Sequence, residues 1–462
     1  IAAAYDQLGA RIYEPLLYEA LGELYLKQER YRDSAETFRA FSRRYPASEY
    51  AHRFHVRVIG IYEAAGFRDL IVDEKREYVA SYTVAGDYYS SSEAPVQAEI
   101  RENLILYIDE LATHNHALAQ AAEPGDAAGL YRQAGDYYRL YIDSFPEDPR
   151  VPEQGFLLAE TRTESGDHAE AVEVFEWVAY EHPHYEKAAD AGYAAILGYG
   201  PLMETAGAGS EAELQRKRID SQLRFASRFE QNTRTAAVLN DAAASLLEAQ
   251  DYTLAIIAAA TLVKRQPAPP RELLVPGWLV ISHSYFELQD YPESSSGYQQ
   301  ALALMQPEDD RREGTVERLA ASLYREAEQL ATAGNTLGAA DAFSRVIDIT
   351  PRAAIRLQAQ FDAAQYYMDA GEFSRANALL EDFRQRFPTD PLAQEVPLKL
   401  VYNLEQLQEW EAAAVELDRI IETESDATRS REMLYLAAEH YQLSLIHISE
   451  PTRLDARSRM PS

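Results

Sequence analysis

Apolar residues recur at helical spacing along most of the chain, in units that resemble one another. The clearest unit begins with an aromatic residue, a Leu-Gly pair and a tyrosine, and continues with a second aromatic set that closes on a proline: Tyr18, Leu21, Gly22 and Tyr25, then Tyr31, Ser34, Phe38, Phe41 and Pro46. Period-3.6 spacing on both sides of a short polar turn predicts two amphipathic helices. The proline cannot continue a helix, so the second helix is expected to end there.

The same pattern returns along the chain and divides it into predicted helical hairpins. They fall near 14–46, 48–82, 94–146, 149–182, 185–230, 233–266, 270–306, 312–350, 352–387 and 391–424, with a lone helix at 427–442. Turn signals between their helices are Ala65-Gly66-Phe67, Ser165-Gly166-Asp167, Ala333-Gly334-Asn335 and Ala370-Gly371-Glu372. Two regions depart from the pattern. Residues 83–125 hold a polar run and an unusually long helix near 95–121, and the glycines within 198–213 predict a loose connection.

This arrangement resembles the tetratricopeptide repeat (TPR), whose units carry an aromatic, a Leu-Gly pair and a Tyr, then Ala-x3-Phe and a closing Pro. The resemblance implies an all-α fold, a right-handed α-solenoid of about ten TPR-like hairpins that runs continuously over residues 14–442. Gly22 is expected to be small because the two helices of its hairpin cross there. Endings such as Phe145-Pro146 and Phe387-Pro388 further resemble TPR proteins of the Gram-negative envelope, namely the β-barrel assembly lipoprotein and the periplasmic coordinator of the Tol-Pal system.

Both ends of the sequence fall outside the repeats. Residues 1–13 are interpreted as the end of an N-terminal fragment, with any signal peptide or lipid anchor expected upstream. Residues 443–462 resemble the translation of a sequencing adapter and have no periodicity after Arg453. They are expected to be a non-native or disordered tail.

The composition and net charge exclude several classes of partner and site. A chain of 462 residues with a formal net charge of -31 repels phosphate backbones, so no nucleic acid is expected to bind. No run of about 18 apolar residues predicts a membrane span. There are no cysteines, which excludes disulfides, thiolate metal sites and cysteine nucleophiles. Their absence does not distinguish the cytoplasm from an envelope compartment.

Histidine pairs are the features that most invite a chemical interpretation. His114 and His116 point in different directions on one helix, and His182 and His184 flank a proline at a helix end. Surface or groove positions explain them better than metal ligation. His52 and His55 fit packing and solvent-facing positions equally. No phosphate-loop, nucleophile-elbow or metalloprotease motif occurs, so we expect no catalytic, cofactor-binding or metal-ligating residues and no enzymatic activity.

The resemblance also implies a binding surface, because the first helix of each TPR hairpin faces a concave groove. Carried onto the two best-matched units, the groove positions are Glu19, Glu23, Leu26 and Lys27, and Leu279, His283, Phe286 and Glu287. Such mixed apolar and charged positions suit a protein or peptide segment. Adaptors that grip chaperone carboxylates need lysines there, and Glu19 and Leu279 occupy the clamp-lysine position.

The sequence therefore predicts a non-enzymatic protein–protein interaction scaffold or adaptor, in the periplasm or at the outer membrane of a bacterial envelope. Two alternatives stay open. The chain can be the solenoid of a larger envelope enzyme, for example a peptidoglycan-active one, whose catalytic domain lies elsewhere, or a cytoplasmic TPR regulatory module. The identity of the partner and the oligomeric state are not determined by the sequence.

Overall fold

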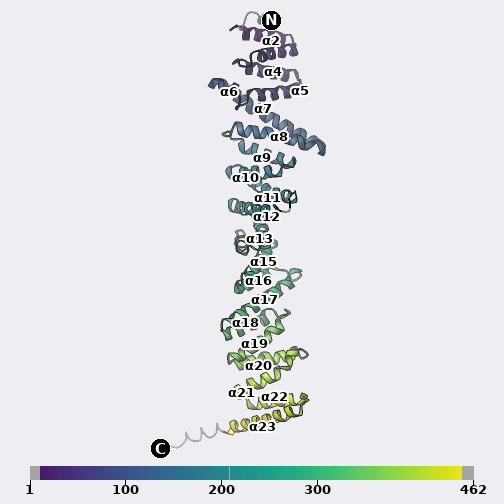
Figure 1. Ribbon diagram of the computed structural model, residues 1–462, viewed down its shortest axis with the longest axis vertical. Coiled ribbons are helices and arrows are strands. Elements are labelled where there is room, and N and C mark those ends of the chain that lie inside the picture. The colour runs from purple at the N-terminus through teal and green to yellow at the C-terminus, as the bar shows by residue number, and fades with distance from the viewer. Residues whose placement is uncertain (1–10, 206, 208, 450–462) are drawn as a thin grey trace, which may run out of the picture. The chain divides into compact units, whose positions relative to one another are not determined.

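The computed structural model describes residues 11–205, 207 and 209–449, and every regular element within those ranges is a helix. The chain forms two compact units, Ile1–Asn232 and Thr233–Ser462. In each unit the helices pack mainly against their neighbours in sequence, as in an α-solenoid. Figure 1 shows this order of elements.

The first unit contains five helical hairpins and one short extra helix among its described residues. They are α2 (Glu14–Lys27) with α3 (Tyr31–Arg44), α4 (Ala51–Ala65) with α5 (Arg68–Tyr82), α6 (Asp87–Ser91), α7 (Ala94–Ala121) with α8 (Pro124–Ser144), α9 (Val151–Glu164) with α10 (His168–Glu181), and α11 (Ala188–Thr205) with α12 (Glu211–Arg228). The long helix predicted near 95–121 is α7.

The second unit continues the pattern. Its described helices are α13 (Thr235–Glu248) with α14 (Tyr252–Val263), α15 (Arg271–Glu287) with α16 (Tyr291–Leu304), α17 (Arg311–Thr332) with α18 (Thr336–Ile349), α19 (Arg356–Asp369) with α20 (Phe373–Arg386), the 3₁₀ turn η1 (Pro391–Gln394), α21 (Val396–Gln406) with α22 (Trp410–Thr423), and α23 (Ala427–Ser449). Together the described residues hold the ten predicted hairpins, which confirms the all-α solenoid of TPR-like units.

Two boundaries differ from prediction. The connection expected over 198–213 is much shorter, because α11 continues through Gly198, Gly200 and Pro201 to Thr205. Gly198 lets α11 approach α10 closely, since a Cβ there would lie 2.6 Å from Val172 Cγ2. At the other end, α23 runs past the expected end at Gln442 to Ser449. The rest of the predicted tail, 450–462, lies outside the described residues, as do residues 1–10 of the predicted N-terminal fragment end.

Eight of the hairpins in the described ranges close through the same backbone turn. One residue adopts a left-handed conformation with φ between 57° and 84°, and the next N–H donates to the carbonyl five residues earlier at 2.8–3.0 Å. This is the Schellman ending of a helix, which favours glycine. Four turns use the predicted glycines: Gly66, Gly166, Gly334 and Gly371. The other four use longer side chains: Glu29, Gln250, Gln289 and Gln408.

These longer side chains give a first testable prediction. We expect Gln250→Gly to raise the free energy of unfolding by about 0.5–1 kcal/mol, because the left-handed conformation costs an L-residue roughly 1–2 kcal/mol and glycine loses part of this gain to its freer unfolded state. Gly166→Ala, at the equivalent turn, should lower it by a similar amount. Chemical unfolding curves of both variants check this. Destabilisation by Gln250→Gly would contradict the assigned turn geometry.

Close helix crossings depend on small residues, as expected for Gly22. A Cβ at Gly22 would lie 2.4 Å from Phe38 Cε2, so α2 and α3 touch there. Ser34 Oγ donates to the Gly22 carbonyl at 2.8 Å across the same crossing. The equivalent contact between α15 and α16 places a Cβ at Gly297 only 2.4 Å from Ser282 Oγ.

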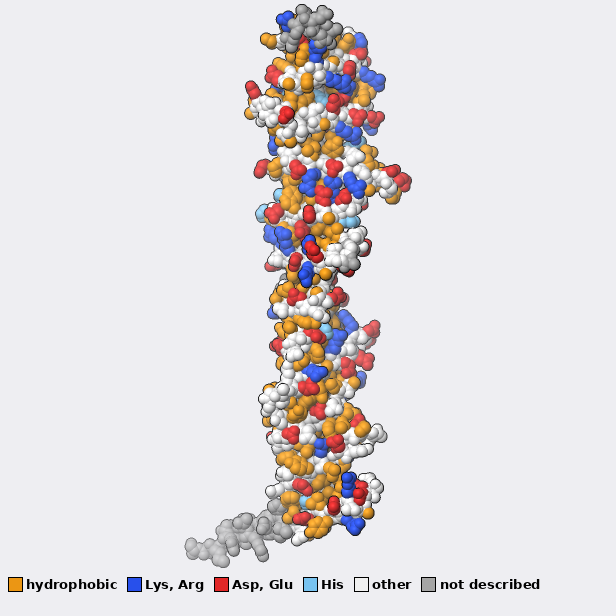
Figure 2. Space-filling view, viewed as in Figure 1, with side chains coloured by type: hydrophobic (Ala, Val, Ile, Leu, Met, Phe, Trp, Pro, Cys, Tyr) orange, Lys and Arg blue, Asp and Glu red, His pale blue; other side chains and the backbone are white. Residues whose placement is uncertain are grey.

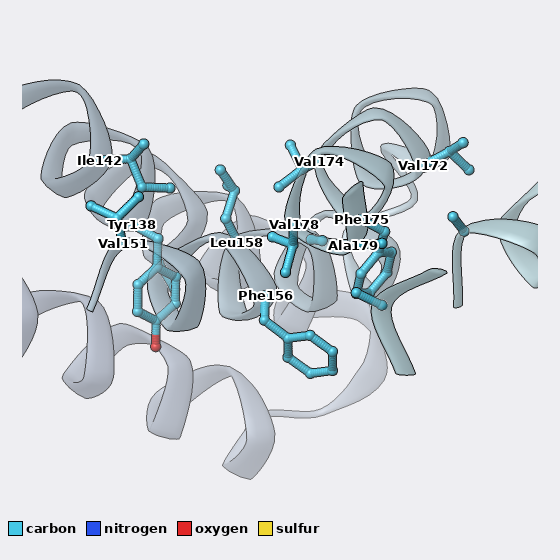
Figure 3. Packing of buried hydrophobic residues seen from close by; sticks show 14 of the residues in the cluster. Tyr138, Ile142, Val151, Phe156, Leu158, Val172, Val174, Phe175, Val178 and Ala179 are labelled. Carbon is cyan, nitrogen blue, oxygen red and sulfur yellow. The ribbon is translucent and has the colours of Figure 1, made fainter. Parts of the chain in front are cut away.

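Each unit is filled by aromatic and aliphatic side chains between successive hairpins. Figure 3 shows one such cluster, in which Leu158 of α9 lies between the α8 residues Tyr138 and Ile142 and the α10 residue Val178. Phe156 packs edge-on against Phe175, with ring centroids 5.5 Å apart. Since each cluster joins adjacent helices, the core is continuous along a unit rather than central.

The structure also decides between the two interpretations of His52 and His55. Both are buried, with exposed fractions of 1% and 7%, so their side chains pack in the core of the hairpin formed by α4 and α5 rather than face solvent. Both rings stand edge-on to Tyr82. Burial lowers the pKa of each to about 4, which keeps both imidazoles neutral near pH 7.

Candidate binding groove

A groove of about 640 Å³ runs over the middle of the first unit. Most of its lining comes from α7, α9 and α11, the first helices of three consecutive hairpins. The lining residues are His116, Gln120, Tyr131, Leu157, Glu160, Thr163, Glu164, His168, Phe175, Ala194, Leu197, Gly198 and Pro201. We call it the α9 groove. It lies on the helices that the TPR resemblance assigns to the binding face.

The floor of the α9 groove is apolar and rests on the core. Phe175 is 5% exposed, and its contact with Phe156 fixes its position. Leu157 is half-buried beside it, whereas Leu197 on α11 is 58% exposed. An exposed leucine in the same groove as a fixed aromatic offers apolar area that a partner side chain can cover.

The groove is also acidic. Glu160 and Glu164 stand one turn apart on α9, on one face of the helix. Desolvation raises the pKa of the Glu160 carboxyl, Lys187 opposes this, and the nearby Glu164 adds to it. A cationic side chain placed between the two carboxylates would relieve their repulsion.

Pro201 adds a backbone acceptor to the groove. It lies inside α11 and has no N–H, so the carbonyl of Leu197 lacks the donor that an α-helix normally supplies four residues later. The Leu197 carbonyl is therefore a candidate acceptor on one of the helices that line the groove.

The first set of predicted groove residues lies on α2. Glu19 and Lys27 are exposed, and Glu23 pairs with Arg57 of α4 at 2.5 Å. Leu26 is half-buried against the core cluster of α2–α5. The structure thus leaves Glu19 and Lys27 accessible, engages Glu23 in an ion pair and uses Leu26 for packing.

The second predicted set lies on α15, in the second unit. Leu279 packs into two core clusters, and Phe286 stands edge-on to Tyr291 at 5.3 Å. His283 lies 3.9 Å from Glu287, and desolvation lowers the pKa of this histidine, aided by Arg318 and opposed by Glu287. Glu287 is exposed. In this set Glu287 is the exposed member, and Leu279, His283 and Phe286 are half-buried.

Sequence reasoning did not single out the α9 groove. The unit at 151–181 has Gly155 where the first helix of the best-matched units has an aromatic, so no groove positions were assigned to it. Trp177 of α10 fills that space instead, since a Cβ at Gly155 would lie 2.5 Å from Trp177 Cζ3. The signal in the sequence that could have indicated this groove is the pair Glu160 and Glu164, which are spaced i, i+4 after an apolar run.

The surface of the described residues carries charges of both signs. On the face shown in Figure 2, red and blue side chains are interspersed with orange ones. Among the described helices, none combines the length and apolar character needed to cross a bilayer.

No protein-family model matches the chain, and no curated protein matches it. Several of the solved structures that are similar to it are described as TPR proteins or TPR domains. A tetratricopeptide repeat protein from Parabacteroides merdae is 16% identical, with 62% of this chain and 98% of that chain covered and a TM-score of 0.27. Yeast Tom70 is 11% identical over 97% of this chain and 99% of its own, with a TM-score of 0.23. The TPR2AB domain of yeast Sti1, solved as a complex with pHSP90, is 15% identical over 64% and 99%, with a TM-score of 0.27. The fold assignment rests on the chain's own hairpins, which make it an α-solenoid of TPR-like units.

Proposed function

We propose that the chain is a non-enzymatic protein-binding scaffold that takes a partner segment in the α9 groove. The observation that supports this is the exposed Leu197, which lines the same groove as the fixed Phe175, most of whose lining comes from successive first helices. A segment bound there presents an apolar side chain to Leu197 and a Lys or Arg to Glu160 and Glu164. One of its backbone N–H groups donates to the Leu197 carbonyl.

A peptide-display selection on the purified chain tests this proposal. We expect the enriched peptides to combine an apolar residue with a nearby Lys or Arg. Leu197→Asp should weaken their binding at least tenfold, because covering a leucine side chain is worth about 1.5–3 kcal/mol and each 1.4 kcal/mol is tenfold. Affinities measured by fluorescence anisotropy give the comparison.

Two matched controls locate the effect. Leu118→Asp alters another exposed leucine, 43% exposed on α7, that does not line the groove, and should leave binding unchanged. Replacing Glu160 and Glu164 by Gln should weaken binding and reduce its salt dependence, whereas Glu147→Gln with Glu181→Gln removes two exposed charges elsewhere. Equal binding by Leu197→Asp and Leu118→Asp would sink the proposal.

We further propose that the scaffold acts in a bacterial cell envelope, in the periplasm or at the outer membrane. The support is the resemblance of its aromatic-Pro helix endings, such as Phe145-Pro146 and Phe387-Pro388, to envelope TPR proteins. Fractionation of cells that express the complete reading frame tests the location. Recovery with the cytoplasmic fraction would favour a cytoplasmic regulatory module instead.

A further inference from the structure

A second polar cluster of the first unit lies away from the α9 groove, where α3, α4 and α5 meet. His55 of α4 faces Glu74 and Glu77 of α5, and one donor atom from each lies within 4.8 Å of the others. The two glutamates share a face of α5 because they are three residues apart. A pocket of about 320 Å³ opens beside all three side chains.

Two buried atoms of this cluster that could ligate a metal make no hydrogen bond. His55 and Glu74 are 7% and 5% exposed, and neither His55 Nε2 nor Glu74 Oε2 makes a hydrogen bond. These two atoms nevertheless lie 3.2 Å apart. Buried polar atoms are normally satisfied, so two that face each other unsatisfied need an explanation.

Their separation is close to that of two ligands of one metal ion. With bonds of about 2.0–2.2 Å, neighbouring ligands of a tetrahedral Zn²⁺ ion are about 3.3–3.6 Å apart. Glu77 is exposed, so its side chain can turn to close the third position.

The surrounding charges hold the ligands in place. Arg39 forms an ion pair with Glu74 Oε1, which leaves Oε2 for another contact. Arg39 and Arg43 both line the pocket, and Glu36 lies 3.2 Å and 3.8 Å from them. With Glu36, Glu74 and Glu77 there are three carboxylates against two guanidiniums, so the cluster stays net negative.

We propose that His55, Glu74 and Glu77 form a divalent metal site, and that Zn²⁺ is the ion its one-nitrogen, two-carboxylate donor set fits. A site with this donor set binds Zn²⁺ more tightly than Mg²⁺. Three protein ligands leave a fourth position open to the pocket for water or a partner's side chain. The ion links α4 to α5, the two helices of one hairpin. The sequence-based expectation of no metal site considered only histidines close in sequence, whereas these ligands meet across two helices.

A competition titration of the full chain tests the site. After chelator treatment and dialysis, Zn²⁺ is added in the presence of a chromogenic chelator, which suppresses weak binding to surface carboxylates. We expect one Zn²⁺ per chain to be withheld from the chelator and Mg²⁺ not to compete. Glu77→Gln should weaken Zn²⁺ binding at least tenfold, and this exposed substitution should leave the helical circular-dichroism signal unchanged.

Glu102→Gln is the matched control, because it removes the same charge from an exposed position on α7 outside the cluster. It should bind Zn²⁺ within twofold of the unaltered chain. Visible absorption of added Co²⁺ gives an independent readout, since a tetrahedral site absorbs more strongly than the hydrated ion. No withheld Zn²⁺, or equal weakening by Glu77→Gln and Glu102→Gln, would overturn the proposal and leave the cluster as internal packing.

Discussion

Gly22→Leu should destabilise the first hairpin by about 3 kcal/mol, at the upper end of what overpacking costs. Even a Cβ at this position would lie 2.4 Å, 2.6 Å and 3.0 Å from three atoms of the Phe38 ring. Phe38 cannot simply turn away, because it is 1% exposed and packs edge-on against Phe54 of α4. The leucine side chain must therefore push α2 away from α3 or displace α4.

Because solenoid units unfold locally, amide hydrogen exchange is the appropriate measurement. We expect faster exchange confined to α2, α3 and α4, together with a lower onset of thermal unfolding. Gly60→Leu is the control, since Gly60 is an exposed α4 glycine whose Cβ would meet no atom within 4 Å. It should stabilise the helix slightly through propensity. Similar behaviour of the two variants would argue against the helix crossing at Gly22.

Phe343→Ala should cost about 3–5 kcal/mol, the usual range for removing a buried aromatic. Phe343 of α18 is 2% exposed and lies between Tyr324 of its own hairpin and Tyr366 of the next hairpin. Its ring stands edge-on to Tyr324 at 4.9 Å and stacks on Tyr366 at 5.5 Å. Truncation leaves a cavity that joins α17, α18 and α19, and also removes both aromatic contacts.

Urea unfolding, followed by a signal from the second unit, measures this loss in the free energy of unfolding. Leu337→Ala is a suitable control, because Leu337 lies on the same helix but is 42% exposed. Its effect should stay below about 1 kcal/mol. A loss for Phe343→Ala no greater than that of Leu337→Ala would contradict its role in joining the hairpins.

The hairpins could be predicted because their signals are local and repeated. Proline endings, turn glycines and aromatic spacing each report on a few residues, and their agreement in phase defines the fold. The turns at Glu29, Gln250, Gln289 and Gln408 escaped notice because a left-handed backbone is not visible when glycine does not mark it. Gly198 misled in the opposite sense, since it serves a close helix contact rather than a chain break.

The candidate sites were harder to predict, because they depend on which side chains the packing leaves free. Leu26 and Phe286 occupy positions that face a groove in regular TPR units, but here they contact the core and Tyr291. Nothing in the local sequence of either residue reports those contacts. Likewise, His55 and Glu74 lie on different helices, so only the packing of α4 against α5 brings them together.

The neighbour-to-neighbour packing of the helices has a mechanical consequence. Pulled at its ends, a unit of this kind has no central core that must rupture as a whole, so its hairpins can peel off one after another. Releasing a hairpin such as Val151–Glu181 frees on the order of 100 Å of extended chain, at roughly 3.3–3.6 Å per residue. Each unit therefore behaves as a stepwise extensible tether, which yields in increments under load instead of breaking at once.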